Sequence, residues 1–155
     1  MDSKVAPLYL VASEQNLLGV HWTQQNVPML SSLTRKDPAS SILSRAVTQL
    51  KEYFKGEREE FDLPLDAEGT EFQKRVWKQL QQIPYGQTRS YQEIARKVRN
   101  PKACRAVGTA NGRNPLSIIV PCHRVITSSG TLGGYAGGLN VKEKLLRLEG
   151  RSLSG

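Results

Sequence analysis

Two adjacent side chains in the second half of the chain, Cys122 and His123, could carry out nucleophilic chemistry. They stand in the string Pro-Cys-His-Arg-Val at residues 121–125, directly after the apolar run 118–120. A thiol reacts as its thiolate, and cationic neighbours such as an imidazole or a guanidinium favour that form. Cys122 is therefore a candidate for attack on an electrophilic carbon. The competing interpretation is a small buried residue without reactivity, which is what most free cysteines are.

The elements that would position this string are mainly helical. Thr70 can cap a helix in which Phe72, Val76, Trp77 and Leu80 share one face. Ser90 and Glu93 form a capping box for a short helix over residues 91–98. Asn100-Pro101 predicts the start of another helix, which runs through Ala110 and is basic and rich in small residues. Two short helices joined by a tight turn at residues 99–100 favour a helix-turn-helix, although many helical hairpins bind nothing.

The remaining elements of the second half follow this helical pair. The apolar run 118–120 predicts a strand, and the glycine-rich segment 130–138 is typical of a wing. A final helix is expected where apolar residues recur at helical spacing, at Val141, Leu145, Leu146 and Leu148.

The first half predicts a small mixed domain. Alternation at Leu8, Leu10 and Ala12, a turn at 13–16 and an apolar run at 17–22 indicate a hairpin. Residues 24–36 are polar and are expected to form a loop. Asp37-Pro38 predicts the start of a helix that Gly56 ends, and residues 61–65 alternate like a third strand. The polar segment 64–70 is the best boundary, which gives domains 1–65 and 66–155.

Composition and charge limit the classes of function. The chain has 155 residues, 38% of them hydrophobic, and a net charge of +8. That charge is uneven: residues 1–65 carry seven Lys/Arg and eight Asp/Glu, net −1, whereas residues 66–155 carry 15 and six, net +9. A basic half favours a polyanion such as nucleic acid over a merely soluble basic surface. The two cysteines, Cys104 and Cys122, cannot build a disulfide framework, which favours a reducing compartment.

The chain resembles the O6-alkylguanine-DNA alkyltransferases in motifs that cover most of residues 70–150 in the family's order. Besides residues 121–125, the matching strings are Arg-Ala-Val-Gly at 105–108, Asn-Gly-Arg-Asn-Pro at 111–115, Gly-Tyr-Ala-Gly-Gly at 134–138 and the segment 142–150. The string around Cys122 is highly specific for this family when it occurs together with these other strings. The first half matches only in size and outline.

The resemblance implies both fold and activity. The expected fold is α/β (α+β), with a ribonuclease H-like domain in 1–65 that has no nuclease activity and a winged-helix DNA-binding domain in 66–155. The implied activity is that of a methylated-DNA–[protein]-cysteine S-methyltransferase, which repairs DNA by direct reversal. The winged-helix domain binds duplex DNA from the minor groove, and an O6-alkylated guanine is flipped out of the duplex. Its alkyl group then moves irreversibly onto Cys122 in a single turnover. O4-alkylthymine is left open as a second substrate.

The resemblance also implies roles for five catalytic residues. Cys122 is the nucleophile of an SN2 transfer, and His123 is the base, acting through a bridging water. Glu149 orients His123 and stabilises its protonated form. Tyr91 donates to the leaving guanine ring, and Asn114 ties the helix-turn-helix to the active-site loop. Without the motif these would be a surface histidine, a solvated glutamate, a packing tyrosine and an ordinary turn asparagine.

Further residues match the family's base-binding and DNA-binding positions. Arg105 matches the arginine finger that fills the vacancy left by the flipped base; the bland alternative is one more phosphate-binding residue. Tyr135 and Ala136 match the lid over the base, and where Ala136 stands the family often has serine, so a hydroxyl contribution is lost. The carbonyls of Cys122 and Val125 match acceptors for the exocyclic amine. The expected DNA-contacting set also includes Gln92, Ala103, Gly108 and Arg113.

No metal and no other cofactor is expected. Some members of this family carry a structural zinc in the first domain. Residues 1–65 contain no cysteine and one histidine, His21, so a four-ligand site of nitrogen and sulfur cannot be assembled there.

Three other functions compete with alkyl transfer. A non-catalytic binder of damaged DNA is disfavoured because such alkyltransferase-like relatives lack cysteine at the position of Cys122. A winged-helix regulator with a cysteine sensor is disfavoured by the length of the chain and the lack of extra cysteines. A cysteine hydrolase would need an acyl substrate, whereas the basic half indicates DNA.

The expected partner is double-stranded DNA that contains O6-alkylguanine, and the protein is expected to be a monomer without DNA. No apolar run approaches the length that spans a bilayer, and the first residues do not resemble a secretory signal. We therefore expect no membrane association and a cytoplasmic location of the bacterial type, at the nucleoid when DNA is bound.

Overall fold

A hairpin begins the chain in the computed structural model, which describes residues 1–23 and 41–150. Strands β1 (Tyr9–Ala12) and β2 (Leu17–His21) pair antiparallel, with an irregularity at the end of β1. The Ser13 hydroxyl accepts the backbone N–H groups of Gln15 and Asn16, which closes the predicted turn. The register pairs Tyr9 with His21, Leu10 with Val20, Val11 with Gly19 and Ala12 with Leu17. The predicted hairpin is therefore confirmed.

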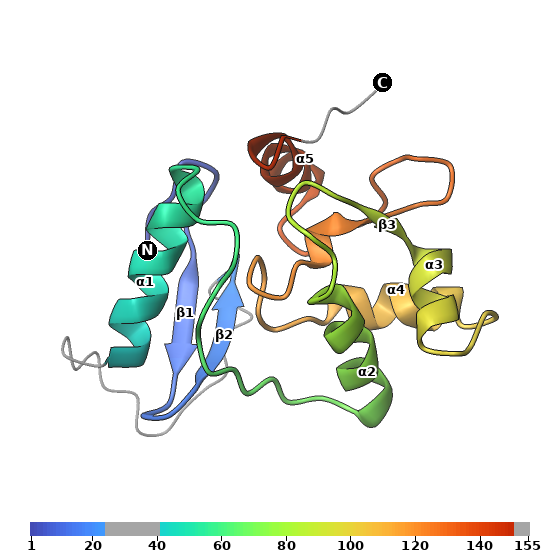
Figure 1. Ribbon diagram of the computed structural model, residues 1–155, viewed down its shortest axis with the longest axis horizontal. Coiled ribbons are helices and arrows are strands. Elements are labelled where there is room, and N and C mark those ends of the chain that lie inside the picture. Colours follow the sequence, from blue (N-terminus) through green and yellow to red (C-terminus); the bar gives the residue numbers. More distant parts are fainter. Residues whose placement is uncertain (24–40, 151–155) are drawn as a thin grey trace.

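One long helix, α1 (Ser41–Phe54), packs against this hairpin (Figure 1). Its buried face carries residues at helical spacing: Ile42, Ala46, Leu50, Tyr53 and Phe54. Gly56 ends it in the left-handed conformation (φ 78°), as the sequence predicts. The expected loop at 24–36 and the expected helix start at Asp37-Pro38 lie outside the described residues.

The predicted strand at 61–65 is wrong. Only Leu65 forms a β-bridge, parallel to Leu17. The backbone N–H and C=O of Asp62 bond instead to the side-chain amide of Gln49, at 2.9 and 3.0 Å. Pro64 has no N–H to donate, so a regular ladder cannot pass through it. Alternation of apolar residues therefore did not identify the hydrogen-bond partners of this backbone.

Two capping boxes set the first helices of the second half. Helix α2 (Glu71–Leu80) begins after Thr70, whose side chain pairs reciprocally with Gln73. Helix α3 (Tyr91–Lys97) begins after Ser90, which pairs in the same way with Glu93. Both predicted starts are confirmed.

The start predicted for the next helix is wrong. Helix α4 (Cys104–Gly112) begins after Ala103, not at Asn100-Pro101. The Asn100 carbonyl accepts the N–H of Ala103 at 2.9 Å, which makes residues 100–103 a turn. Arg99 lies in the left-handed region, with a φ of 62°. Residues 99–103 therefore form the turn between α3 and α4, and the expected start of the helix lies within this turn.

The predicted strand at 118–120 is also wrong. These residues form a buried turn, held by N–H bonds from Ile119 to Ser117 and from Val120 to Leu116. Ile118 has a φ of 73°, an unusual conformation for a β-branched residue that only its surroundings can impose. Apolar side chains predicted burial here, and burial was then mistaken for extended backbone.

Short elements connect this turn to the last helix. Residues Cys122–Arg124 form the 3₁₀ turn η2, and β4 (Val125–Ile126) pairs in parallel with β3 (Arg89–Ser90). The expected wing, residues 130–138, is fully described and contains no strand. Helix α5 (Leu139–Leu148) follows and confirms the predicted final helix.

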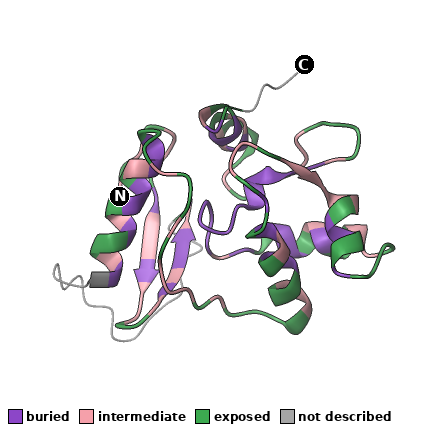
Figure 2. Ribbon diagram, in the orientation of Figure 1, coloured by how far each residue is buried: buried purple, intermediate pink, exposed green. Residues whose placement is uncertain are grey.

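One continuous apolar core joins the two halves of the chain (Figure 2). Val20 of β2 forms a β-bridge with Leu116, and the connecting segment 66–70 lies outside helices and strands. Figure 2 shows buried residues concentrated between α1 and the hairpin and around η2 and β4. Cys122 itself lies within a continuous run of buried residues, 116–126.

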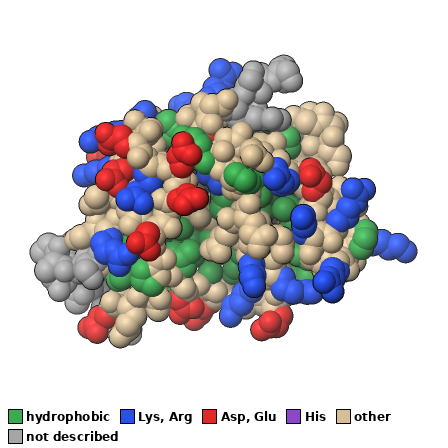
Figure 3. Space-filling view, in the orientation of Figure 1, with side chains coloured by type: hydrophobic (Ala, Val, Ile, Leu, Met, Phe, Trp, Pro, Cys, Tyr) green, Lys and Arg blue, Asp and Glu red, His purple; other side chains and the backbone are tan. Residues whose placement is uncertain are grey.

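Charge divides the visible surface as the sequence predicts. Figure 3 shows Lys and Arg gathered over the α2–α4 side of the molecule, whereas Asp and Glu are more frequent on the α1 side. Within residues 1–23 and 41–150, no helix combines the length and the apolar character needed to cross a bilayer.

Candidate active site

Cys122 opens η2 in a fully packed setting. Its side chain is only 3% exposed, and its backbone N–H donates to the Val120 carbonyl at 2.8 Å. The Cys122 carbonyl accepts the side-chain amide of Asn111 at 3.3 Å and the N–H of Val125. Burial and these backbone hydrogen bonds together hold Cys122 in place.

The thiol is buried beside groups that favour its ionised form. Burial raises the pKa of Cys122, and hydrogen bonds from the side chains of Asn114 and Tyr135 and the charge of Lys142 act in the opposite direction. In the resting protein burial dominates, so the thiol pKa lies above its ordinary value. A thiolate formed here would have two donors and one cation around it.

His123 is completely buried and bonds to Glu149. The distance between Nε2 of His123 and Oε2 of Glu149 is 2.7 Å. Nδ1 of His123 is buried and has no hydrogen-bond partner within the described residues. Burial lowers the pKa of His123, against the pull of Glu149, so the ring is neutral. With Nε2 donating to the carboxylate, Nδ1 carries the lone pair and can accept a proton.

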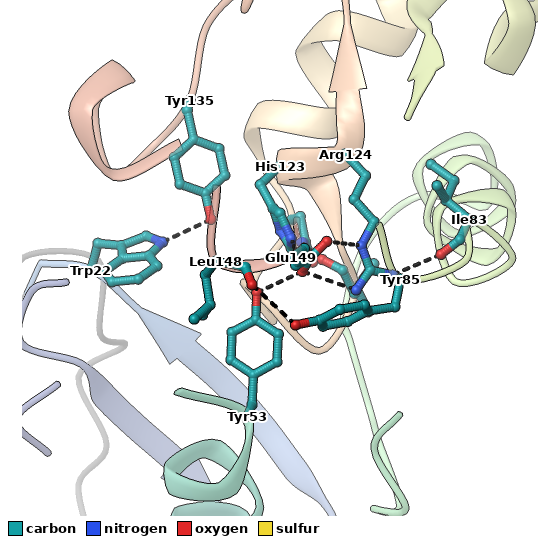
Figure 4. Close-up of polar contacts among 11 residues, drawn as sticks. Trp22, Tyr53, Ile83, Tyr85, His123, Arg124, Tyr135, Leu148 and Glu149 are labelled. Carbon is teal, nitrogen blue, oxygen red and sulfur yellow. Dashed lines mark hydrogen bonds and ion pairs between the residues drawn. The ribbon is translucent and has the colours of Figure 1, made fainter. Parts of the chain in front are cut away.

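Glu149, the residue that follows α5, accepts hydrogen bonds from three side chains in two other parts of the chain (Figure 4). It accepts the hydroxyl of Tyr53 at 2.6 Å, His123, and two bonds from Arg124 at 2.8 and 3.0 Å. Burial alone would raise the pKa of Glu149, but His123 and Arg124 together hold it far below its usual range. The carboxylate is thus a permanent anion behind the histidine.

Arg124 closes this cluster on its far side. Its Nη1 donates to the Ile83 carbonyl at 2.7 Å, and its guanidinium lies 5.7 Å from the ring centre of Tyr85. The sequence suggested that Arg124 could favour the thiolate. The structure directs this cation to Glu149 instead.

Lys142 supplies the cation that Arg124 does not. It is 0% exposed, and its ammonium donates to the carbonyls of Val125 at 2.6 Å, Gly134 at 3.1 Å and Leu132. Within the described residues it forms no ion pair with a carboxylate. Burial lowers its pKa to about 8, and Cys122 acts in the opposite direction. Lys142 therefore joins β4 to the 132–134 segment beside the thiol.

Asn114 lies where the resemblance expects it, between the helices and the Cys122 loop. Its Nδ2 donates to the Val120 carbonyl at 2.8 Å, and its Oδ1 accepts the N–H of Leu116 at 3.0 Å. The two bonds span the turn that holds Ile118 and fix the approach to Cys122. This geometry fits the expected positioning role.

Tyr135 covers the thiol from the loop before α5. Its hydroxyl lies next to Cys122 and accepts the indole N–H of Trp22 at 3.0 Å (Figure 4). Burial raises the pKa of Tyr135 well above its usual value, so the phenol is protonated. Ala136, its neighbour in the expected lid, is exposed.

Tyr91 starts α3 and faces the same region. Its ring lies 5.9 Å from the Lys142 ammonium, and burial, followed by the proximity of Cys122, raises its pKa. Gly133 has a φ of 71°, and a Cβ there would lie 2.9 Å from the Tyr91 hydroxyl. A protonated phenol is therefore held close to Cys122 and against a glycine.

The expected DNA-contacting residues lie away from this cluster. Arg105 is exposed on α4, and within the described residues its guanidinium has no ion-pair partner. Gly108 lies one turn further along, where a Cβ would meet only the Tyr91 ring, at 3.9 Å. Packing inside the protein therefore does not require glycine there. Arg113 is exposed at the opposite end of α4 from Ala103, which directly precedes the helix.

Gln92 and Val125 are both used inside the protein. The Gln92 amide donates to the Pro101 carbonyl at 3.1 Å, across the turn between α3 and α4. The Val125 carbonyl accepts from Lys142, which leaves one lone pair for a ligand. The structure thus brings Tyr91, Val125 and the lid around Cys122, and leaves Arg105 on the surface.

Two cavities flank the site without reaching the sulfur. One of about 610 Å³ is lined by residues that include His21, Trp22, Arg113, Ser117 and Ala136. Another of about 510 Å³ lies between the 59–65 segment and residues 81–85. Cys122 lines neither cavity, so in this conformation the loop that carries Tyr135 covers the sulfur.

No metal-binding cluster occurs in the described part of the chain: residues 1–23 and 41–150 contain no group of three or more His, Cys, Asp and Glu side chains that could hold an ion. The absence of a metal stays a prediction.

Sequence reasoning missed the residues that the first domain contributes. Tyr53 and Trp22 reach Glu149 and Tyr135 from positions 96 and 113 residues away in the chain. Each looked like an ordinary aromatic on an apolar face. Lys142 fell inside a matching segment but was given no role, although a lysine within the apolar face of a predicted helix was a usable signal.

Comparison with known proteins shows the family of the chain. Residues 1–67 match the model of the 6-O-methylguanine DNA methyltransferase, ribonuclease-like domain, and residues 71–151 match that of the 6-O-methylguanine DNA methyltransferase, DNA binding domain. A Methanosarcina acetivorans methylated-DNA–protein-cysteine methyltransferase is 48% identical over 151 residues, 96% of this chain and 95% of its own. A Mycobacterium bovis protein of the same name is 52% identical over 149 residues, 96% and 89% of the two chains.

Solved structures extend the likeness to the fold. The crystal structure of a Mycobacterium tuberculosis O6-methylguanine methyltransferase superposes with a TM-score of 0.84 at 50% identity, over 100% of this chain and 93% of its own. A Mycobacterium tuberculosis protein crystallised in complex with DNA gives 0.84 at 51%, over 96% and 89%. The chain belongs to the 6-O-methylguanine DNA methyltransferase family and has its two-domain fold. The resemblance and the fold class inferred from the sequence are confirmed.

Proposed function

We propose that this protein repairs duplex DNA by moving the alkyl group of O6-alkylguanine onto its own Cys122, once per molecule. The observation that carries the proposal is the convergence of the buried thiol, two protonated phenols and a neutral histidine backed by a permanent anion. This set can ionise a sulfur and protonate a leaving group without a cofactor. The names and DNA complex of the relatives support the same conclusion.

In the proposed reaction the thiol proton goes to Nδ1 of His123, and Glu149 stabilises the resulting cation. The sulfur forms a bond to the alkyl carbon while the bond from that carbon to O6 breaks. The electron pair stays on the guanine, which takes a hydrogen bond or proton from Tyr91. The thioether has no route back to a thiol, so the protein acts once.

Recognition of the damaged base is assigned to the exposed side of α3 and α4. Arg105 is exposed on α4, its guanidinium has no ion-pair partner within the described residues, and it can occupy the space left by an extruded base. The remaining lone pairs of the Val125 and Cys122 carbonyls can accept the exocyclic amine. Gln92, Ala103, Gly108 and Arg113 would contact the DNA backbone, with binding from the minor groove.

We place the division between the two domains at residues 65 and 66. The exposed 66–70 segment and the start of α2 at Glu71 support this placement. We further propose a monomer in the absence of DNA and a cytoplasmic location, at the nucleoid when DNA is bound. Light scattering of the free protein tests the first of these proposals.

Intact-protein and peptide mass spectrometry test the transfer. After incubation with an O6-methylguanine duplex, the peptide that contains Cys122 should gain one methyl mass, and the peptide that contains Cys104 should not. The variant Cys122→Ser should gain nothing. An unmodified wild-type protein would reject alkyl transfer and favour a non-catalytic binder. An O4-methylthymine duplex in parallel measures the second substrate.

Two variants test the assigned roles. Arg105→Ala should slow repair of duplex DNA far more than reaction with free O6-benzylguanine, which needs no base flipping. Equal losses on both substrates would remove the finger role. Tyr91→Phe should slow transfer with little change in DNA affinity, and an unchanged rate would remove Tyr91 from the chemistry.

A further inference from the structure

The lid residue Tyr135 is attached to the first domain by Trp22. The indole N–H donates to the Tyr135 hydroxyl at 3.0 Å, and the two rings meet edge to face with centres 6.3 Å apart (Figure 4). Trp22 directly follows β2 and is buried, so it is fixed by the hairpin. The contact therefore joins a rigid part of the first domain to the loop that covers Cys122.

A second contact strengthens this attachment. A Cβ at Gly137 would lie 2.8 Å from the Trp22 ring, so the backbone of the 134–138 loop packs directly on the indole. Any side chain at this position would push the loop away from the ring. Trp22 thus holds the lid at two points, through the Tyr135 hydroxyl and through the Gly137 backbone.

The same Tyr135 hydroxyl closes the nucleophile. It lies next to Cys122, which is 3% exposed and lines neither of the two cavities described above. A purine can reach the sulfur only after Tyr135 moves away from it. That movement breaks the bond to Trp22. The adjoining cavity of about 610 Å³, lined by Trp22, Ser117 and Ala136, gives the loop and the ring room to rearrange.

We propose that Trp22 is a positioning residue for the alkyl transfer, which holds the Tyr135 lid closed over Cys122 in the free protein and releases it when the damaged base enters. This inference rests on the proposed function, since the lid matters only if a base must reach the sulfur. It gives the first domain a direct part in base entry. It also explains why that domain presents an indole N–H, and not merely an apolar surface, to the lid.

The rate at which a small electrophile alkylates Cys122 measures how often the lid opens. In the full chain without DNA, Trp22→Phe keeps an aromatic ring and removes the donor. Cys122 should then react with iodoacetamide about five-fold faster, the factor that corresponds to one typical net hydrogen bond. The half-exposed Cys104 of the same molecule serves as the internal reference and should react at the wild-type rate.

Trp77→Phe is the matched control, because its indole N–H makes a comparable buried bond to the Ala110 carbonyl of α4, at 2.8 Å, and not to Tyr135. It should leave the labelling rate of Cys122 unchanged. A Trp22→Phe rate equal to or below the wild-type rate would overturn the proposal. If Trp22→Phe also accelerates Cys104, the variant has loosened generally, and Tyr135→Phe decides. With labelling rates expressed per thiolate, that variant must accelerate Cys122 alone, and adding Trp22→Phe to it must bring no further increase.

Fluorescence gives a readout that a merely structural role would not move. In a Trp77→Phe, Cys122→Ser protein, Trp22 is the only tryptophan and no transfer occurs. Its emission should change on binding an O6-methylguanine duplex and not on binding the same duplex undamaged. Equal responses, or none, contradict release of the lid. The labelling experiment tests the role of Trp22 without DNA. Methyl transfer by the wild-type protein tests the proposed function without a Trp22 variant. Failure of one proposal is therefore distinguishable from failure of the other.

Discussion

Two buried charges flank the reactive cysteine, and the protein neutralises them in opposite ways. Glu149 accepts donors from Tyr53, His123 and Arg124, one of which is a full positive charge at bonding distance. Lys142 donates to three backbone carbonyls, and within the described residues no carboxylate pairs with it. Both side chains are almost completely buried.

The difference shows which charge is structural and which is reactive. An ion paired with an opposite charge keeps its ionisation, and the pKa of Glu149 is accordingly far below its usual range. An ion surrounded only by dipoles is held less firmly, and burial lowers the pKa of Lys142 to about 8. Within the part of the chain that the structure describes, the group that can supply Lys142 with a negative charge is the Cys122 thiolate. The unpaired cation therefore favours the ionised nucleophile.

Removing the paired charge should have the largest effect. Glu149→Gln leaves the buried guanidinium of Arg124 without its counter-ion, which typically costs about 3–5 kcal/mol of unfolding free energy. Urea unfolding measures this loss. The matched control is Glu143→Gln on α5, whose exposed pair with Arg147 should contribute less than about 1 kcal/mol. Equal losses in the two variants would show that burial does not distinguish the pairs.

Acid sharpens the same comparison. Since the folded pKa of Glu149 lies below the ordinary 4.5, the unfolded chain takes up a proton below pH 4.5 that the folded chain resists. Wild-type stability should therefore fall with pH below this value, and Glu149→Gln should lack that component of the fall. Parallel curves for the two proteins would contradict the pKa direction.

Local signals in the sequence predicted much of this framework. Thr70 with Gln73 and Ser90 with Glu93 place two helix starts, because capping depends on residues three apart. The segments at 61–65 and 118–120 were mistaken for strands for the opposite reason. Their backbone conformation depends on Gln49 and on the turn at Ile118, which no local pattern reveals.

Some residues of the candidate site could likewise be identified from the sequence, and others could not. The motifs identified Cys122, His123 and Glu149, and the structure brings the last two into contact. Tyr53 and Trp22 could not be found, because the sequence does not state which aromatic of the first domain faces the second. Arg124 was assigned to the wrong partner, since adjacency in the chain suggested the thiol and the fold provides a buried carboxylate.

Removing the unpaired cation should have an intermediate effect. Lys142→Met keeps the length of the side chain but leaves three carbonyls without their donor, and we expect a loss of about 2 kcal/mol. The Cys122 pKa should rise, so that transfer slows most near neutral pH and recovers in alkali. Lys144→Met, exposed on the same helix, is the control for both measurements.

Alkali should reveal the titration of Lys142 itself. Its pKa is about 8 in the folded chain and 10.5 as the ordinary value, so between these values the unfolded chain binds more protons. The stability of the wild type, relative to Lys142→Met, should therefore rise from pH 8 to pH 10.5. A relative fall over this range would mean that Lys142 stays charged in the fold and that the comparison with Glu149 fails.

The smallest effect is expected where the first domain supports the paired charge. Tyr53→Phe removes one of four bonds to Glu149 and leaves both cationic bonds from Arg124 in place, so we expect a loss of about 1.5 kcal/mol. Tyr85→Phe is the control, because its hydroxyl makes a longer bond, 3.3 Å, to an uncharged acceptor, the Leu148 carbonyl, and should cost less. Since Tyr53 competes with His123 for the same carboxylate oxygen, the variant should also raise the pKa of His123, which an NMR titration of the imidazole measures. An unchanged pKa of His123 would mean that Tyr53 holds Glu149 in place without affecting the pKa of the histidine.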